Sequence, residues 1–73
     1  MFKLTFEREK QRVNKSELSR RTGIALTDIC NIESGKMYPW PGWRARIAKV
    51  LGVDETVLFD REGWPRKEDG DEQ

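Results

Sequence analysis

The sequence predicts an all-α protein built from five short helices. Three observations favour this fold class. Apolar residues recur at helical spacing, glycine and proline divide the chain into short segments, and no segment alternates with the period of two that a half-buried strand requires. The chain has 73 residues, which is enough for one small domain.

The first two helices are expected over residues 4–12 and 15–22. The first of these segments consists mostly of residues that favour helix. Asn14 has the position of an N-cap for the second helix, and Glu17 follows three residues later as in a capping box. Gly23 is expected to end this helix, because glycine adopts a left-handed backbone conformation at little cost.

The third helix is expected over residues 26–34, where Ile29 and Ile32 share one face and Gly35 follows the last turn. Residues 41–51 are expected to form the fourth helix. It has a proline in its first turn, an apolar stripe at helical spacing and a glycine after its last residue.

A last short helix is expected after Asp54, which has the position of its N-cap. Val57, Leu58 and Phe59 cannot all be buried by so short a helix. One exposed member of this set would suit a contact between two copies of the chain.

Residues 1–60 are therefore expected to form the domain, and residues 61–73 a flexible acidic tail. The tail contains two glycines, a proline and a cluster of acidic residues, so it is either disordered or loosely docked. Trp64 is the residue in it that would fold back on the body.

The net charge of +1 conceals an asymmetry along the chain. Residues 1–49 contain eleven basic and five acidic residues, a net charge of +6, whereas residues 50–73 contain three basic and eight acidic residues, a net charge of −5. A basic body of this kind is compatible with a polyanionic partner such as nucleic acid.

Composition also argues against several classes of function. The chain has one cysteine, Cys30, and no histidine, so it offers no intramolecular disulfide, no Cys/His zinc site and no histidine-based catalysis. No catalytic constellation is evident, so we expect no enzymatic activity, no cofactor, no metal and no small-molecule ligand. We find no membrane-spanning run and no secretory signal, and we expect a cytoplasmic protein without a membrane partner.

The second and third segments form the most informative pattern. Two short helices joined by a tight glycine turn cannot lie antiparallel and must cross steeply, which the small side chains of Ser19 and Ala25 permit. This is helix-turn-helix geometry, and a helix over residues 26–34 is about as long as a DNA major groove is wide, roughly 12 Å.

On these residues the chain resembles the Cro/phage-repressor (XRE) family of helix-turn-helix proteins. The resemblance covers residues 4–58 without a gap, and the matching positions are Arg8, Val13, Asn14, Glu17-Leu18-Ser19, Gly23-Ile24, Ile29, Ile32-Glu33-Ser34-Gly35-Lys36, Pro39, Ile47-Ala48 and Leu51-Gly52-Val53. It implies a compact, lambda-repressor-like five-helix bundle and a buried structural ion pair between Arg8 and Glu33. Thr22 and the Trp40-Pro41-Gly42-Trp43 segment depart from the family pattern.

The resemblance also implies which residues would contact DNA. The positions expected to read bases are Leu26, Thr27, Asp28 and Asn31, since asparagine can pair with adenine and threonine or leucine can contact a thymine methyl group. The residues expected to contact phosphates lie at the start of the second helix and after the end of the third. They are Asn14, Lys15, Ser16, Ser34, Lys36 and Tyr38.

The sequence thus predicts a transcriptional regulator, typical of a small phage-like or prokaryotic repressor. It would bind double-stranded DNA at a palindromic operator as a homodimer. The alternative is a protein-interaction module on the same fold, or the antitoxin of a toxin–antitoxin pair.

Overall fold

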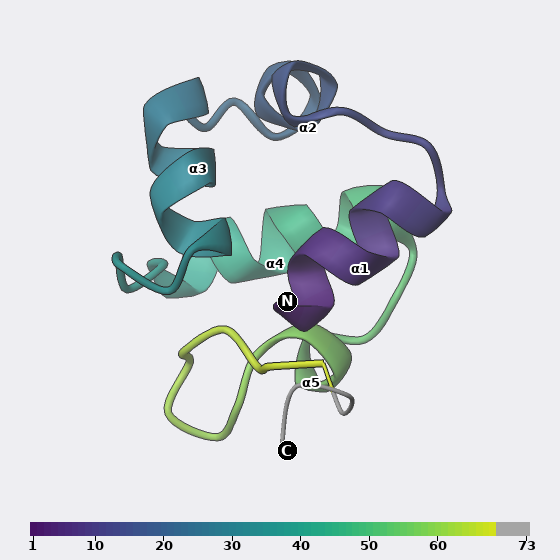
Figure 1. The fold of residues 1–73 in the computed structure, drawn as a ribbon. Helices are drawn as coiled ribbons and strands as arrows, with labels where there is room; N and C mark the ends of the chain where they lie inside the picture. The colour runs from purple at the N-terminus through teal and green to yellow at the C-terminus, as the bar shows by residue number, and fades with distance from the viewer. Residues whose placement is uncertain (69–73) are drawn as a thin grey trace.

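A computed structural model describes residues 1–68 of the chain, and it confirms the all-α class and the five helices (Figure 1). The helices are α1 (Lys3–Lys10), α2 (Lys15–Thr22), α3 (Leu26–Glu33), α4 (Pro41–Leu51) and α5 (Glu55–Leu58). Within the described residues, extended pairing is limited to two isolated antiparallel bridges. No helix in this part of the chain is both long and apolar enough to cross a lipid bilayer.

The helix ends follow the local sequence. The Asn14 side chain accepts a hydrogen bond from the Glu17 backbone N–H at 2.7 Å, which confirms its role as the N-cap of α2. Gly23, Gly35 and Gly52 all have positive φ angles and end α2, α3 and α4 as expected.

The first helix is shorter than the sequence predicts. It ends at Lys10, because Arg12 adopts a φ of 60° and reverses the chain. The backbone N–H of Val13 then bonds to the Arg8 carbonyl and that of Arg12 to the Glu9 carbonyl, the Schellman pattern that glycine usually provides. The Arg8 guanidinium also donates to the Val13 carbonyl at 2.8 Å, which fixes this turn from inside the protein.

The core lies at the centre of the five helices and includes residues from each of them. Its buried apolar residues are Leu4, Val13, Leu18, Ile24, Ile29, Ile32, Ile47, Ala48, Leu51, Leu58 and Phe59. Trp43 is half-buried against this cluster. Burial of this set is the main stabilising term for so small a domain.

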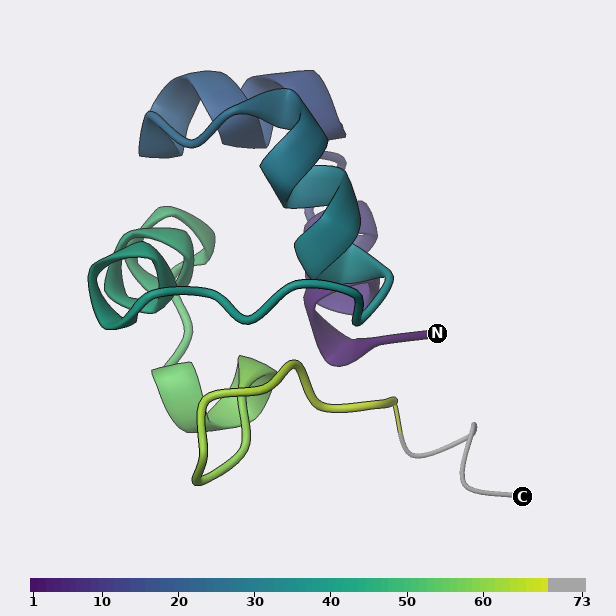
Figure 2. The ribbon, with the colours of Figure 1, turned by 90° about the vertical axis from the view of Figure 1, so that its left-hand side faces the viewer.

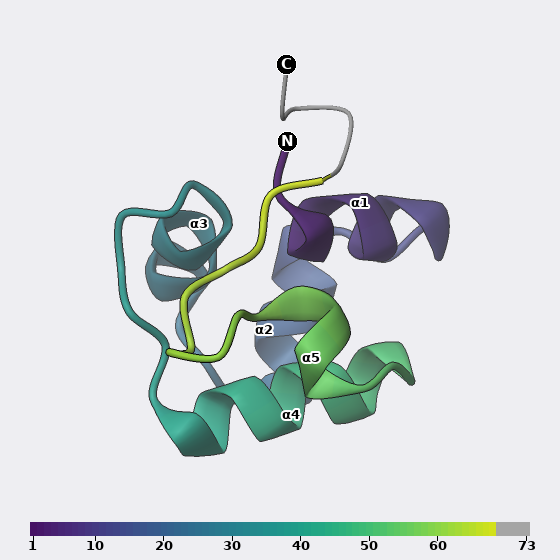
Figure 3. The same ribbon diagram turned by 90° about the horizontal axis from the view of Figure 1, so that it is seen from below.

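The segment after α5 differs from the expected flexible tail. Residues 60–68, which we call the strap, turn back and run along the body to the N-terminus (Figure 3). Pro65 is paired with Phe59, and Lys67 with Phe2, in the two bridges. The rest of the predicted tail, residues 69–73, lies outside the described residues.

The burial at α5 agrees only in part with the expectation. Leu58 and Phe59 are buried and Val57 is half-buried against the core, so the three are not all buried, but none of them is the fully exposed residue suggested for a dimer contact. The reason is that the strap covers α5, and the Arg66 backbone N–H donates to the Leu58 carbonyl at 2.8 Å.

Asp54 caps α5 as predicted. Its carboxylate accepts hydrogen bonds from the backbone N–H of Thr56 at 2.9 Å and from the Thr56 hydroxyl at 2.8 Å. Both bonds favour the charged carboxylate and hold the pKa of Asp54 below its ordinary value of 3.8.

Candidate functional site

The connection between α2 and α3 is short and internally bonded. Gly23 follows α2 with a φ of 77°, and the Ser19 hydroxyl donates to the Ile24 carbonyl. The buried Thr22 hydroxyl donates to the Leu18 carbonyl at 2.7 Å and accepts from the Ile24 N–H at 3.3 Å. The hydroxyl of Thr22 therefore stabilises the turn directly, which gives a local reason for threonine at this position.

This turn sets α3 steeply across α2, as both views of the pair show (Figures 1 and 2). Ile29 and Ile32 are fully buried on the inner side of α3. Leu26 is 43% exposed, Thr27 is exposed, and Asp28 and Asn31 are half-buried. The four residues expected to read bases thus all retain exposed surface on α3.

The outer side of α3 also carries polar groups that make no bonds of their own. Within residues 1–68, the side chains of Thr27 and Asn31 have no hydrogen-bond partner; the Asn31 backbone carbonyl accepts from Lys36 and Ser34. A half-exposed amide with both donor and acceptor capacity can bind an external partner without first breaking an internal bond.

The C-terminal end of α3 is held by the ion pair that the family resemblance implies. Arg8 donates to the Glu33 carboxylate through Nε at 2.6 Å and through Nη2 at 3.0 Å, and Thr5 donates to it at 2.9 Å. Both charged side chains are buried. The pair joins α1 to the last residue of α3 and so fixes where the end of α3 lies.

The start of α2 provides the first group of residues expected to contact phosphates. Asn14, Lys15 and Ser16 are all exposed at this end of the helix. The Asn14 side-chain oxygen accepts the capping hydrogen bond, and its amide nitrogen can still donate to a phosphate oxygen. Backbone N–H groups at a helix N-terminus and a nearby lysine suit an anion.

The second group lies where α3 ends. Ser34 and Lys36 are exposed on either side of Gly35, which has a φ of 77°. Residues 34–40 form a loop that leads to α4 along the same face of the molecule as α3 (Figure 2). Lys36 is therefore the first basic residue after the end of α3.

Tyr38 is used differently from the expected phosphate contact. Its hydroxyl donates to the Glu62 carbonyl of the strap at 2.9 Å. A phenol has a single donor hydrogen, so this bond uses the hydrogen that a phosphate oxygen would accept. This use of Tyr38 could not be predicted from the sequence, because Glu62 lies 24 residues away in the expected tail.

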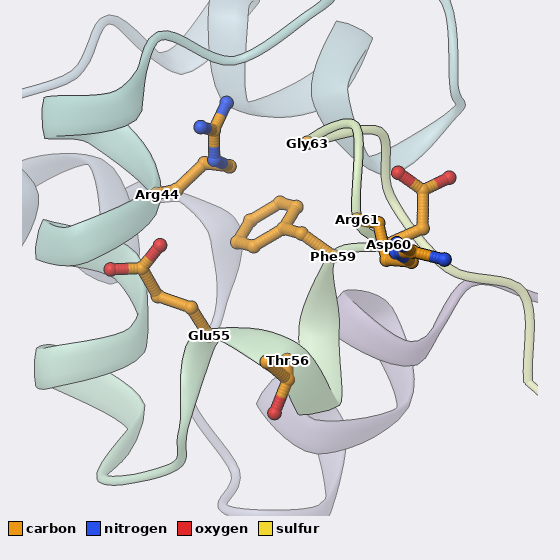
Figure 4. Close-up of a pocket in the computed structure, with 7 residues that line it drawn as sticks. All are labelled: Arg44, Glu55, Thr56, Phe59, Asp60, Arg61 and Gly63. Carbon is orange, nitrogen blue, oxygen red and sulfur yellow. The ribbon is translucent and has the colours of Figure 1, made fainter.

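An open pocket of about 190 Å³ lies between α4, α5 and the strap (Figure 4). Two of the polar side chains that line it have partners: Arg44 donates to the Pro39 carbonyl at 2.7 Å, and the Asp60 carboxylate accepts the N–H groups of Glu62 and Trp64. The aromatic ring of Phe59 lies between Arg44 and Thr56 in this view. The pocket is thus the seam where the strap meets the body.

Trp64 folds back on the body as the sequence suggests, whereas the contacts of Arg44 were not predicted. Both contact Tyr38. The ring of Trp64 meets it edge-on at 5.1 Å, and the Arg44 guanidinium lies 5.4 Å from its centroid. A tryptophan and a proline in an otherwise polar tail were the available signal for docking.

The described residues contain no group of three or more side chains suited to hold a metal ion. Cys30 is a free thiol on α3 and is half-buried. Comparisons with protein-family models, with curated proteins and with solved structures found no match to this chain.

Proposed function

We propose that this protein is a sequence-specific DNA-binding transcriptional regulator with a lambda-repressor-like helix-turn-helix. In this proposal α2 and α3 are the helix-turn-helix, and α3 lies in the major groove of double-stranded DNA. The protein acts as a homodimer, and each copy reads one half of a palindromic operator.

The proposal rests on the side chains that the outer side of α3 presents. It presents Thr27 and Asn31 with polar groups that have no partner within residues 1–68, while the inner side is locked into the core. An asparagine amide can form two hydrogen bonds to adenine, and the threonine methyl group can contact thymine. Leu26 adds exposed apolar surface of the kind that suits a thymine methyl.

Phosphate contacts would come from the two ends of the pair. Lys15 and Ser16 begin α2, and Ser34 and Lys36 follow α3. These groups orient the protein on the duplex and provide salt-dependent affinity, whereas base preference comes from α3. We do not assign Tyr38 a phosphate contact, since its hydroxyl hydrogen is donated to the strap.

The test is a selection of bound duplexes from a random DNA pool, followed by affinity measurements on the selected site. We expect symmetric half-sites. Asn31→Ala should reduce the preference at one base pair of each half-site by about 1–3 kcal/mol while retaining affinity for the phosphate backbone. An unchanged preference in this variant would show that α3 does not read bases through Asn31.

Lys36→Ala provides the complementary measurement. It should weaken binding to all sequences and make the salt dependence shallower by about 0.9 in log–log slope, the value for one phosphate contact. Lys49→Ala is the matched control, since Lys49 is also exposed and lies in the last turn of α4. This end of α4 is remote from α3 (Figures 1 and 3).

The alternative function is protein interaction through the same face. The exposed side chains of Leu26 and of Trp40, which is 60% exposed, favour it. The same experiment separates the two functions, because a protein-interaction module would not bind duplex DNA even at low salt.

A further inference from the structure

The strap holds the loop after α3 on both sides of Lys36. On one side, the aromatic ring of Phe2 lies directly beneath Gly35, where an added Cβ would meet the ring at 2.6 Å. Phe2 is in turn paired with Lys67 of the strap, and the Lys3 N–H donates to the Arg66 carbonyl at 2.7 Å. The residue before Lys36 is thus braced by the strap through the N-terminus.

On the other side, the strap contacts Tyr38 itself. The Tyr38 hydroxyl donates to the Glu62 carbonyl at 2.9 Å, and the Trp64 ring lies edge-on to the Tyr38 ring at 5.1 Å. Arg44 contacts the Tyr38 ring and donates to the Pro39 carbonyl, so α4 is tied to the same point.

The strap forms a tight turn next to these contacts. The Asp60 carboxylate accepts the backbone N–H groups of Glu62 and Trp64 at 2.9 and 3.0 Å, which closes a tight turn. Gly63 is buried at this turn, and a Cβ there would lie 2.8 Å from the Tyr38 hydroxyl oxygen and closer still to Arg44. The φ of 97° favours glycine at position 63, and an added Cβ would also displace the ends of the Arg44 and Tyr38 side chains.

We propose that the strap positions the loop for DNA binding, and that Trp64 is a positioning residue for the phosphate contact of Lys36. The inference rests on the proposed function and adds an element that the helix-turn-helix alone does not include. Trp64 acts through Tyr38, which cannot leave the strap without losing both a hydrogen bond and a ring contact. A loop fixed in this way places the Lys36 ammonium with less loss of conformational entropy on binding.

The experiment compares the wild-type chain with Trp64→Ala, Lys36→Ala and the double variant on one selected duplex over a range of salt concentrations. Each phosphate contact multiplies the binding constant by the molar salt concentration raised to the power of about −0.9. At 0.1 M salt, one contact is therefore worth roughly eightfold in affinity. We expect Trp64→Ala to lose up to this factor in affinity and to have a shallower slope. We also expect the double variant to bind as Lys36→Ala alone does, because the two changes remove the same contact.

Two further variants separate positioning from general destabilisation. Trp64→Phe keeps an aromatic ring against Tyr38 and should restore much of the affinity and the salt slope. Val50→Ala removes two methyl groups from a half-buried residue of α4 that packs against the core, and it should lower stability without changing the slope. Circular dichroism of each variant reports whether the helices are retained.

The outcomes are distinct. An unchanged salt slope in a folded Trp64→Ala variant, or additive losses in the double variant, would overturn the positioning role while leaving DNA binding intact. A wild-type chain that does not bind duplex DNA would overturn the proposed function and this inference together.

Discussion

The buried Arg8–Glu33 pair permits a quantitative prediction for Glu33→Ala. The Glu33 carboxylate accepts three hydrogen bonds, at 2.6 and 3.0 Å from Arg8 and at 2.9 Å from Thr5. Its side chain is only 3% exposed, so the substitution removes the buried counter-charge of the guanidinium and leaves only the exposed Glu9 carboxylate, at 3.8 Å. Removing one partner of such a pair costs about 3–5 kcal/mol.

That cost is large for a chain of this size. At about 0.05–0.15 kcal/mol per residue, a 73-residue protein has a free energy of unfolding of about 4–11 kcal/mol. The melting temperature should fall by at least about 12 °C, since each kcal/mol corresponds to about 4–8 °C in a domain this small. Urea and thermal unfolding followed by circular dichroism measure both quantities.

The matched control is Glu9→Ala, because Glu9 is the exposed partner of the same arginine. Its carboxylate lies 3.8 Å from Arg8 and is 56% exposed, so its loss should cost at most about 1 kcal/mol. The double variant Arg8→Met with Glu33→Leu should recover much of the lost stability, since it leaves no unpaired buried charge. If Glu33→Ala and Glu9→Ala had equal effects, the reasoning from burial would be refuted.

Two further predictions concern stability at helix ends. Gly35→Ala should destabilise the fold by more than Gly52→Ala. Both glycines have a positive φ, but only the new methyl group at position 35 must displace the Phe2 ring. Chemical denaturation of the two variants measures the difference, and equal losses of unfolding free energy would contradict the prediction. For Asp54, whose pKa is lowered in the folded state, the stabilisation is present above pH 3.8 and is lost as the pH falls through the lower folded value. The difference in unfolding free energy between wild type and Asp54→Ala should therefore shrink below pH 3.8, and a pH-independent difference would count against the cap.

Local rules account for the parts of the fold that the sequence predicts well. Asn14 caps α2 and Gly23, Gly35 and Gly52 end three helices, because these effects depend on a few neighbouring residues. The end of α1 was misplaced because Arg12 has no intrinsic preference for a positive φ. It is held there by the Arg8 bond to the Val13 carbonyl, which is part of the buried ion-pair network.

The candidate site divides in the same way. Helical periodicity predicted that Ile29 and Ile32 face inward, and the resemblance named the positions on the rest of α3 that would contact DNA. The use of Tyr38 could not be predicted, because it depends on a carbonyl 24 residues away that reaches the loop only when the strap folds back.

By itself, the sequence determined the helical class, most of the helix caps and stops, and the inward faces of α3 and α4. Only the tertiary structure decided that residues 60–68 join the body, that Tyr38 donates to the strap, and that Gly35 lies against Phe2. The physical reason is range. Capping and periodicity act within one or two helical turns, whereas the strap is held by single long-range bonds and ring contacts that carry no periodic signature in the chain.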